Sequence, residues 1–266
     1  MESGVYEATK KNGEKYYRAG ITYRGKHISL GSFDNESKAH SAYMEAGELL
    51  TTEDITLLNY SSHIKTLSLE KTISLLNFRD NHLYIKNPIY LQKGFFLYYL
   101  DNNKILKFDN DDLFYYSSHK IQKRGNHLFV ADYGMQYSIL SRYGIRPFAV
   151  AGRDYVYANQ DETDLRYSNI IVINRYHGVL KETKKGITRY KALIHLNGDF
   201  IIGRFNTEEE AAVAYNKAVD YCKDHGFDKN FIQNYVVEYS PKEYADVYVE
   251  IKLTGAFKRY VAASKA

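Results

Sequence analysis

The sequence is poor in residues that would impose a fold by covalent or membrane constraints. It has one cysteine, Cys222, no tryptophan and three prolines among 266 residues. A single cysteine cannot form a disulfide within the chain, so a disulfide-stapled fold is excluded. No apolar run approaches the ~18 residues that a membrane span requires, and the first residues lack the basic and apolar regions of a signal peptide. We therefore expect no membrane partner and a reducing, cytoplasmic compartment.

Length and charge narrow the classes of protein further. A chain of 266 residues is long enough for two or three domains. The formal net charge of +4 and the pI of about 8.7 permit a nucleic-acid partner without requiring one.

An internal repeat is the strongest pattern in the chain. Residues 29–46 read SLGSFDNESKAHSAYMEA, and residues 201–218 read IIGRFNTEEEAAVAYNKA. At a constant spacing the two copies share seven residues, which indicates a duplicated structural unit. The shared pairs are Gly31 and Gly203, Phe33 and Phe205, Glu36 and Glu208, Ala39 and Ala211, Ala42 and Ala214, Tyr43 and Tyr215, and Ala46 and Ala218.

Each copy has the pattern of three strands followed by a helix. Alternation around residues 17–22 predicts a strand with one apolar face, and the Asn197-Gly198 pair is typical of a hairpin turn. Residues 207–210 form a capping box, and Asp34 or Asn35 can cap the first helix. Small alanines at helical spacing let the helix lie close on one face of the sheet. The other face of each sheet is left bare.

Positive charge is concentrated in the strands of both copies. Residues 5–32 hold six lysines and arginines against two acids, and residues 176–206 hold six against two. A basic three-stranded sheet can lie in the major groove of DNA and place side chains on phosphates and base edges. The alternative is a solvated charged face without a partner. On charge, the candidate contacts are Lys10, Lys11, Lys15, Arg24, Lys26, Lys184, Lys185, Arg189 and Arg204.

The residues that the copies share resemble the Apetala-two (ethylene-response-factor) DNA-binding domain. The resemblance covers residues 4–50 and 177–222, and the spacing from Gly-x-Phe to Ala-x-x-Ala-Tyr is met twice. That domain occurs in plant transcription factors and in phage HNH homing endonucleases. In that family the bare sheet face reads the major groove of DNA. By position, the resemblance implies DNA contacts at Arg18, Thr22, His27, Ser29, Lys191 and His195. It departs at Tyr6 and Leu180, where plant members have arginine, and at Ser29 and Ile201, where they have tryptophan. The DNA target therefore cannot be carried over.

The segment between the copies resembles a degenerate HNH nuclease module over residues 155–170, and less closely over residues 89–94. An HNH site needs a carboxylate and an asparagine for a divalent metal and a histidine as general base. Here the resemblance places Val156 at the carboxylate, Tyr157 at the base and Tyr137 near the upstream histidine, and retains Asn169. Valine cannot ligate Mg²⁺, and tyrosine is a poor base at neutral pH. We expect no catalytic residue, no metal site and no cofactor.

The sequence thus predicts an α+β protein with four parts. These are a first sheet-plus-helix DNA-binding domain (1–52), a mixed α+β degenerate-nuclease middle (53–175), a second DNA-binding domain (176–225) and a helical extension (226–266). Buried strands are expected at 95–100, 128–131 and 170–173, and helices at 66–77 and 241–251. The last helix needs a partner for its apolar side, either the body of the chain or a second subunit in a homodimer.

The interpretation that follows is a cleavage-dead homing endonuclease that binds double-stranded DNA as a repressor in the cytoplasm of a bacterial host. Two alternatives stay open at this point. One is an active metal-dependent endonuclease whose ligands lie elsewhere, and the other is a protein-interaction module with an incidental basic face.

Overall fold

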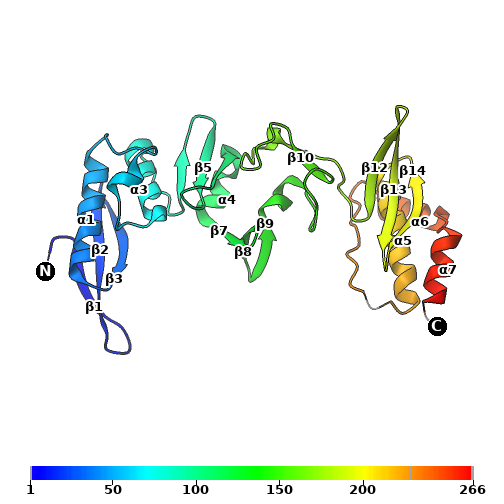
Figure 1. The fold of residues 1–266 in the computed structure, drawn as a ribbon, viewed down its shortest axis with the longest axis horizontal. Helices are drawn as coiled ribbons and strands as arrows, with labels where there is room; N and C mark the ends of the chain where they lie inside the picture. The colour runs from blue at the N-terminus through cyan, green and yellow to red at the C-terminus, as the bar shows by residue number, and fades with distance from the viewer. Residues whose placement is uncertain (1, 228, 265–266) are drawn as a thin grey trace. The chain divides into compact units, whose positions relative to one another are not determined.

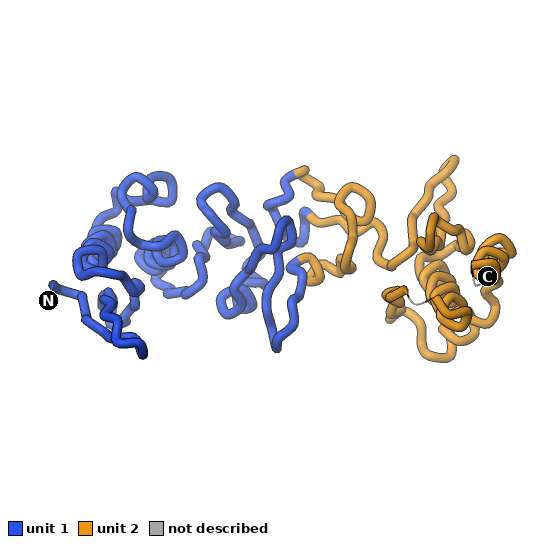
Figure 2. The backbone as a smooth tube through the Cα atoms, turned by 60° about the horizontal axis from the view of Figure 1, so that its bottom comes forward, with its two compact units in different colours: residues 1–139, 161–169 blue, residues 140–160, 170–266 orange. Residues whose placement is uncertain are grey.

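The computed structural model describes residues 2–227 and 229–264. Two compact units make up the chain, one of residues 1–139 and 161–169 and the other of residues 140–160 and 170–266 (Figure 2). Each unit contains one copy of the repeat, and all sheets are antiparallel (Figure 1). The predicted α+β class is confirmed.

The first unit begins with a three-stranded sheet covered by a helix. Its strands lie in the order β1-β2-β3, and α1 packs across one face. The Asn35 side chain caps α1 by accepting a hydrogen bond from the backbone N–H of Lys38 at 2.9 Å, one of the two caps that the sequence allowed. The elements are β1 (Val5–Thr9), β2 (Lys15–Tyr23), β3 (Lys26–Phe33) and α1 (Glu36–Thr51).

The hydrophobic core under this sheet continues well past the repeat. Buried residues from Val5 to Tyr99 form one cluster, and α3 (Leu69–Asn81) packs against α1. Ser68 caps α3, so the helix predicted at 66–77 begins three residues later. The short α2 (Tyr60–His63) lies between the two helices in the sequence. The buried core is continuous across residue 52. The domain boundary predicted there stays a prediction.

The rest of the first unit consists of two small sheets and a short helix. Phe96, Phe108 and Tyr116 are fully buried together, with the Phe108 and Tyr116 ring centroids 4.4 Å apart. The elements are β4 (Ile89–Leu91), β5 (Phe95–Tyr99), β6 (Ile105–Asp109), α4 (Leu113–Ser118), β7 (Ile121–Arg124), β8 (His127–Asp132) and β9 (Met135–Ser138). Single 3₁₀ turns cover residues 110–112, 139–143 and 167–169.

The second unit repeats the sheet and helix of the first. The predicted capping box at Thr207 and Glu210 is present at the start of α5. The strand predicted at 170–173 is present, but it is not buried, because it pairs only with β10 and Ile171 is 50% exposed. The elements are β10 (Tyr155–Tyr157), β11 (Ile170–Val172), β12 (Val179–Lys184), β13 (Ile187–His195), β14 (Asp199–Phe205) and α5 (Glu208–Asp224).

Two helices complete the core of the second unit. The predicted helix near the end is α6 (Pro241–Glu250), with a capping box at Ser240 and Glu243. Its apolar side packs on the core of this unit, and α7 (Gly255–Ala263) buries Phe257 and Val261 in the same core. The predicted homodimer stays a prediction. None of the helices in the described part of the chain is long and apolar enough to cross a bilayer.

The two copies match in irregular details as well as in their elements. Each sheet has a register shift at the same place, after Ala19 in one and after Ala192 in the other. Because a bulge is a specific local feature of a strand pair, its recurrence supports the repeat that the sequence shows.

Candidate nucleic-acid interface

The cross-strand register of the second sheet separates its two faces. Val179, Ala192 and Gly203 are partners in one row, and the first two are fully buried under α5. Because side chains alternate along a strand, the next row points away from the helix, and it holds Leu180, Lys191 and Arg204. This surface, on the side opposite to α5, is called the outer face below.

The outer face of the second sheet carries a cluster of cations. Arg189, Lys191 and Arg204 lie on it, and Lys184 ends β12 on the same side, with Lys185 in the adjoining turn. The Glu182 carboxylate accepts from Lys191 Nζ at 2.5 Å and from Arg204 Nε at 3.1 Å. Those two hydrogen bonds, that of Lys191 first, hold the pKa of Glu182 below its ordinary value.

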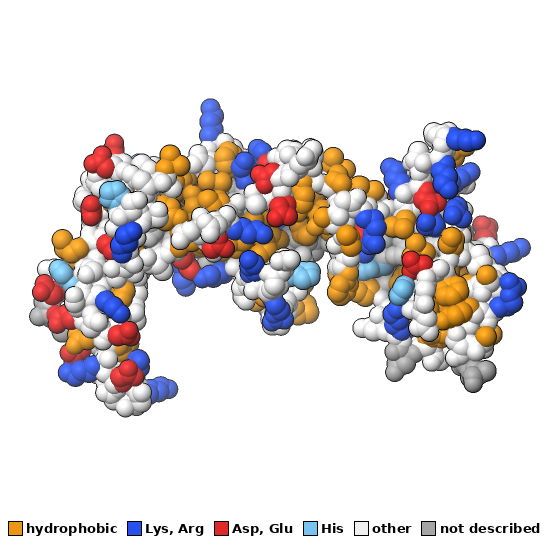
Figure 3. Space-filling view, viewed as in Figure 1, with side chains coloured by type: hydrophobic (Ala, Val, Ile, Leu, Met, Phe, Trp, Pro, Cys, Tyr) orange, Lys and Arg blue, Asp and Glu red, His pale blue; other side chains and the backbone are white. Residues whose placement is uncertain are grey.

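The remaining cations of this face are available to a ligand. Within the described residues, Lys184, Lys185 and Arg189 form no ion pair. Figure 3 shows Lys and Arg side chains gathered over the β12–β13 hairpin. The sixth residue predicted in this copy, His195, lies at the opposite end of the outer face, where its Nδ1 is 2.8 Å from a carboxylate oxygen of Asp199.

The outer face of the first sheet is less basic than predicted. Arg18, Thr22, His27 and Ser29 lie on it, as the resemblance implies, and Thr22 Oγ1 is 3.4 Å from His27 Nδ1. Arg18 is the one lysine or arginine on the strands of this face.

The other predicted cations of the first copy lie elsewhere. Lys10 and Lys11 are in the β1–β2 turn, where Lys10 pairs with Glu14 at 3.0 Å. Lys15 shares the helix side with Glu7 and pairs with it at 2.9 Å.

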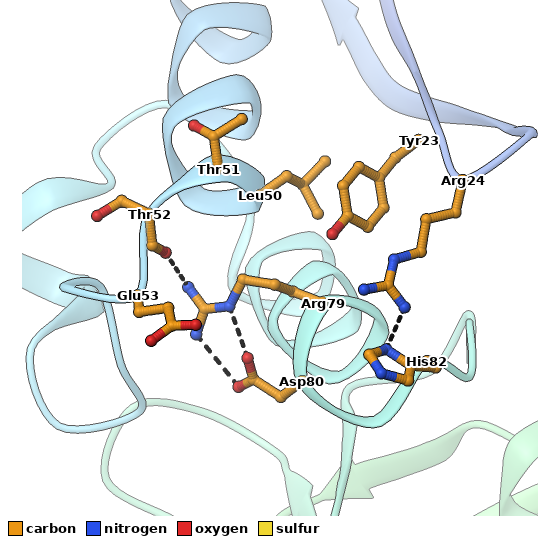
Figure 4. A pocket seen from close by; sticks show the side chains of 9 residues that line it. All are labelled: Tyr23, Arg24, Leu50, Thr51, Thr52, Glu53, Arg79, Asp80 and His82. Atoms are coloured by element: carbon orange, nitrogen blue, oxygen red, sulfur yellow. Dashed lines mark hydrogen bonds and ion pairs between the residues drawn. The ribbon is translucent and has the colours of Figure 1, made fainter.

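Arg24 and Lys26 are directed toward α3 rather than toward the outer face. The Arg24 guanidinium contacts the imidazole of His82, and Lys26 Nζ lies 5.0 Å from the ring centroid of Tyr84. Arg24 lines a polar pocket of about 500 Å³ whose other side is formed by the ends of α1 and α3 (Figure 4). In that pocket Arg79 donates to the carbonyl oxygens at the end of α1, at 2.7 Å for Thr52. The pocket thus lies where Arg79 links the end of α3 to the end of α1 within the first unit.

Two arginines that the sequence analysis did not select lie beside the outer face of the second sheet. Arg146 and Arg153 line a cavity of about 370 Å³ together with Leu180, Leu193 and His195. Both guanidinium groups pair with the fully buried Asp154 carboxylate, at 3.1 Å and 2.8 Å. The pairing with Arg153 and a backbone hydrogen bond from Val150 offset burial and lower the pKa of Asp154. No spacing in the sequence marks these arginines, because a loop brings them to the sheet.

Two residues that the resemblance assigns to the nuclease site, Val156 and Asn169, take part in local backbone pairing and hydrogen bonding. Val156 pairs with Ile171 in the β10–β11 hairpin. The Asn169 side chain is buried and its Nδ2 donates to the carbonyl oxygen of Asp164 at 2.7 Å. Across residues 2–227 and 229–264, no group of three or more His, Cys, Asp or Glu side chains is arranged to hold a metal ion.

In each copy the repeat helix packs on one face of the sheet, and the outer face of the second sheet is rich in cations and bordered by a pair of arginines. Comparison of the chain with family models, with curated proteins and with solved structures finds no match.

Proposed function

We propose that this chain binds specific double-stranded DNA and represses transcription by covering a promoter. The observation that carries the proposal is the outer face of the second sheet, where Lys184, Lys185 and Arg189 project without acidic partners among the described residues. A three-stranded sheet of this kind fits the major groove, and unpaired cations on it can neutralise phosphates. The first sheet offers a second, less charged reading surface with Arg18 at its centre.

We further propose that the chain derives from a homing endonuclease and no longer cleaves DNA. Val156 and Tyr157 stand where the resemblance requires a metal-binding carboxylate and a general base. Neither side chain can do that chemistry at neutral pH. The cytoplasm of a bacterial host is the compartment in which such a protein would act.

The experiment is a mobility-shift titration on genomic fragments at ~150 mM salt, with and without Mg²⁺. We expect a discrete shift on one fragment and intact DNA in both conditions. Cut DNA in Mg²⁺ would show an active endonuclease, and the absence of any shift at micromolar protein would favour a protein-interaction module.

A matched pair of triple variants identifies the surface responsible. In one, Lys184, Lys185 and Arg189 are changed to alanine; in the other, Lys223, Lys242 and Lys258, which are exposed on α5, α6 and α7, are changed. The net charge falls equally in both. We expect the first variant to make the negative slope of log affinity against log salt shallower by roughly 2–3, and the second to leave the slope unchanged. Equal slopes would show that the outer face is not the DNA-binding surface.

A further inference from the structure

The outer face of the second sheet has an apolar centre between its cations. Leu193 and Ile201 are cross-strand partners on it. Leu180 pairs with Lys191, two residues before Leu193 on β13, and so lies diagonally across from Leu193. Leu180 and Leu193 line the same cavity, and Ile201 is 42% exposed. These three residues are called the apolar patch below. Because α5 covers the opposite face, the patch contributes nothing to the core of the unit.

Charge surrounds the apolar patch on two sides. Lys191 and Arg204 lie in the same cross-strand row as Leu180, next to the row of Leu193 and Ile201. On the other side, Arg146 and Arg153 line the cavity that the two leucines share. A partner that fits this surface must therefore be apolar at one small point and anionic around it. In the major groove of DNA, the 5-methyl group of thymine is an apolar point of this kind, and phosphates border the groove.

The corresponding positions of the first copy do not form such a patch. Register places Tyr6, Gly20 and Ser29 where the second copy has Leu180, Leu193 and Ile201. A Cβ atom on Gly20 would lie 2.9 Å from the imidazole of His27, so a larger side chain there requires His27 to move. The two outer faces thus have matching strand registers and different surface chemistry at their centres.

We propose that the apolar patch contacts the 5-methyl group of thymine and makes the second copy selective for a thymine that the first copy does not read. This inference rests on the proposed function, because it assigns a base contact to the same DNA-binding face. Arg153, whose side chain is 53% exposed, would lie against a phosphate next to that thymine, and the largely buried Arg146 would hold Asp154 in place beside it.

The test replaces thymine by deoxyuridine, which lacks only the methyl group. A duplex bound by the full chain is first selected from a random-sequence library. It is then prepared with deoxyuridine at single thymine positions, and the dissociation constant is measured for each. We expect at least one thymine at which the substitution weakens binding about fourfold, the effect of removing one buried methyl group.

The variant Ile201→Ser assigns the effect to the patch, since serine is the residue of the first copy at this position. The control is Ile187→Ser, at an isoleucine that is 61% exposed near the tip of the β12–β13 hairpin. We expect Ile201→Ser to bind the thymine and deoxyuridine duplexes equally, and the control to keep the fourfold difference. The wild-type comparison stands alone if Ile201→Ser fails to fold, which circular dichroism would reveal.

The outcomes separate this inference from the proposed function. Binding that is insensitive to deoxyuridine at every position overturns the inference while DNA binding stands. A sensitivity that persists in Ile201→Ser places the methyl contact elsewhere and also overturns it. A library from which no duplex is selected overturns the proposed function, and the inference with it.

Discussion

Gly4 and Gly178 occupy the same place in the two copies, just before the first strand. Both have a positive φ, of 72° and 69°, and a Cβ atom on either would lie about 2 Å from a ring carbon of Tyr43 or Tyr215. These tyrosines are one of the residue pairs by which the repeat was found. The sequence thus contained both members of this contact, and only the fold shows why they are required together.

Replacing Gly178 by alanine should destabilise the second unit by about 2–4 kcal/mol, because it combines an unfavourable φ with a clash against a packed ring. The control is Gly186→Ala, at a φ of 78° with nothing within 4 Å of the new Cβ. That change should cost about 1 kcal/mol, for the φ alone. Urea denaturation followed by circular dichroism measures both. Equal losses of stability would show that the tyrosine ring yields without cost.

His177 should make the stability of the second unit depend on pH. Burial, assisted by the neighbouring Arg146 and opposed by Asp154, lowers its pKa from 6.5 to about 4. Between these values the unfolded chain binds a proton that the folded chain does not. The free energy of unfolding should therefore fall as the pH is lowered from about 6.5 to about 4, by roughly 3 kcal/mol. Denaturation across this range should show a flatter profile for His177→Gln, and parallel profiles would contradict the assignment.

At the scale of elements, each repeat helix forms hydrogen bonds through one charged side chain to the backbone of a later segment. The side chain is an acid in the first copy and a lysine in the second. The Glu45 carboxylate on α1 accepts from the backbone N–H groups of residues 65–67, at 2.9 Å for Leu67. At the same position of α5, Lys217 Nζ donates to carbonyl oxygens at the end of α6, at 2.7 Å for Ile251. Each bond joins a charged group to backbone groups that a helix leaves unpaired at its ends or that a loop exposes.

Glu45→Lys should release the segment around residue 66 from α1, since a cation there faces three N–H groups. We expect the amide protons of residues 65–67 to exchange with solvent at least tenfold faster, which corresponds to a loss of ~1.4 kcal/mol or more. Hydrogen exchange with mass spectrometry measures this rate. Lys65→Glu, at an exposed side chain nearby, serves as the charge control, and protected amides in Glu45→Lys would contradict the role given to the carboxylate.

Much of the element pattern could be predicted, because it depends on local chemistry. The strands, the helices of both copies and the capping boxes at Thr207 and Ser240 follow from alternation and from side chains that bond nearby N–H groups. Burial of β11 could not be predicted, because an apolar run does not reveal how many strands will pair with it. The sequence did hold a signal for Lys26: strand alternation puts it opposite to His27, and hence on the helix side. The place of Arg146 depends on a loop and leaves no periodic signal.

At the scale of the whole molecule, two copies in one chain should bind two segments of one DNA site. On the proposed function, each copy alone would bind weakly, and tethering would raise the effective concentration of the second. Changing Arg18 to alanine in the full chain should shorten the footprint at one end of the site, and changing Lys184, Lys185 and Arg189 should shorten it at the other. Hydroxyl-radical footprinting of the selected duplex measures both. Variants that lose the same protected segment would show that the copies do not bind separate parts of the site.

Glu182 has a consequence for how such a protein would search for its site. Because its single carboxylate bonds both Lys191 and Arg204 and offsets one of their two charges, a phosphate that binds both cations would have to displace it. Random DNA gains little from that exchange, whereas a site that also satisfies the neighbouring base contacts can compensate for it. Genomes offer at least ~10⁶ competing non-specific sites, so the competing Glu182 carboxylate would leave more of the protein unbound by non-specific DNA. If the chain binds DNA as proposed, this single acidic residue would set the contrast between cognate and background sequence.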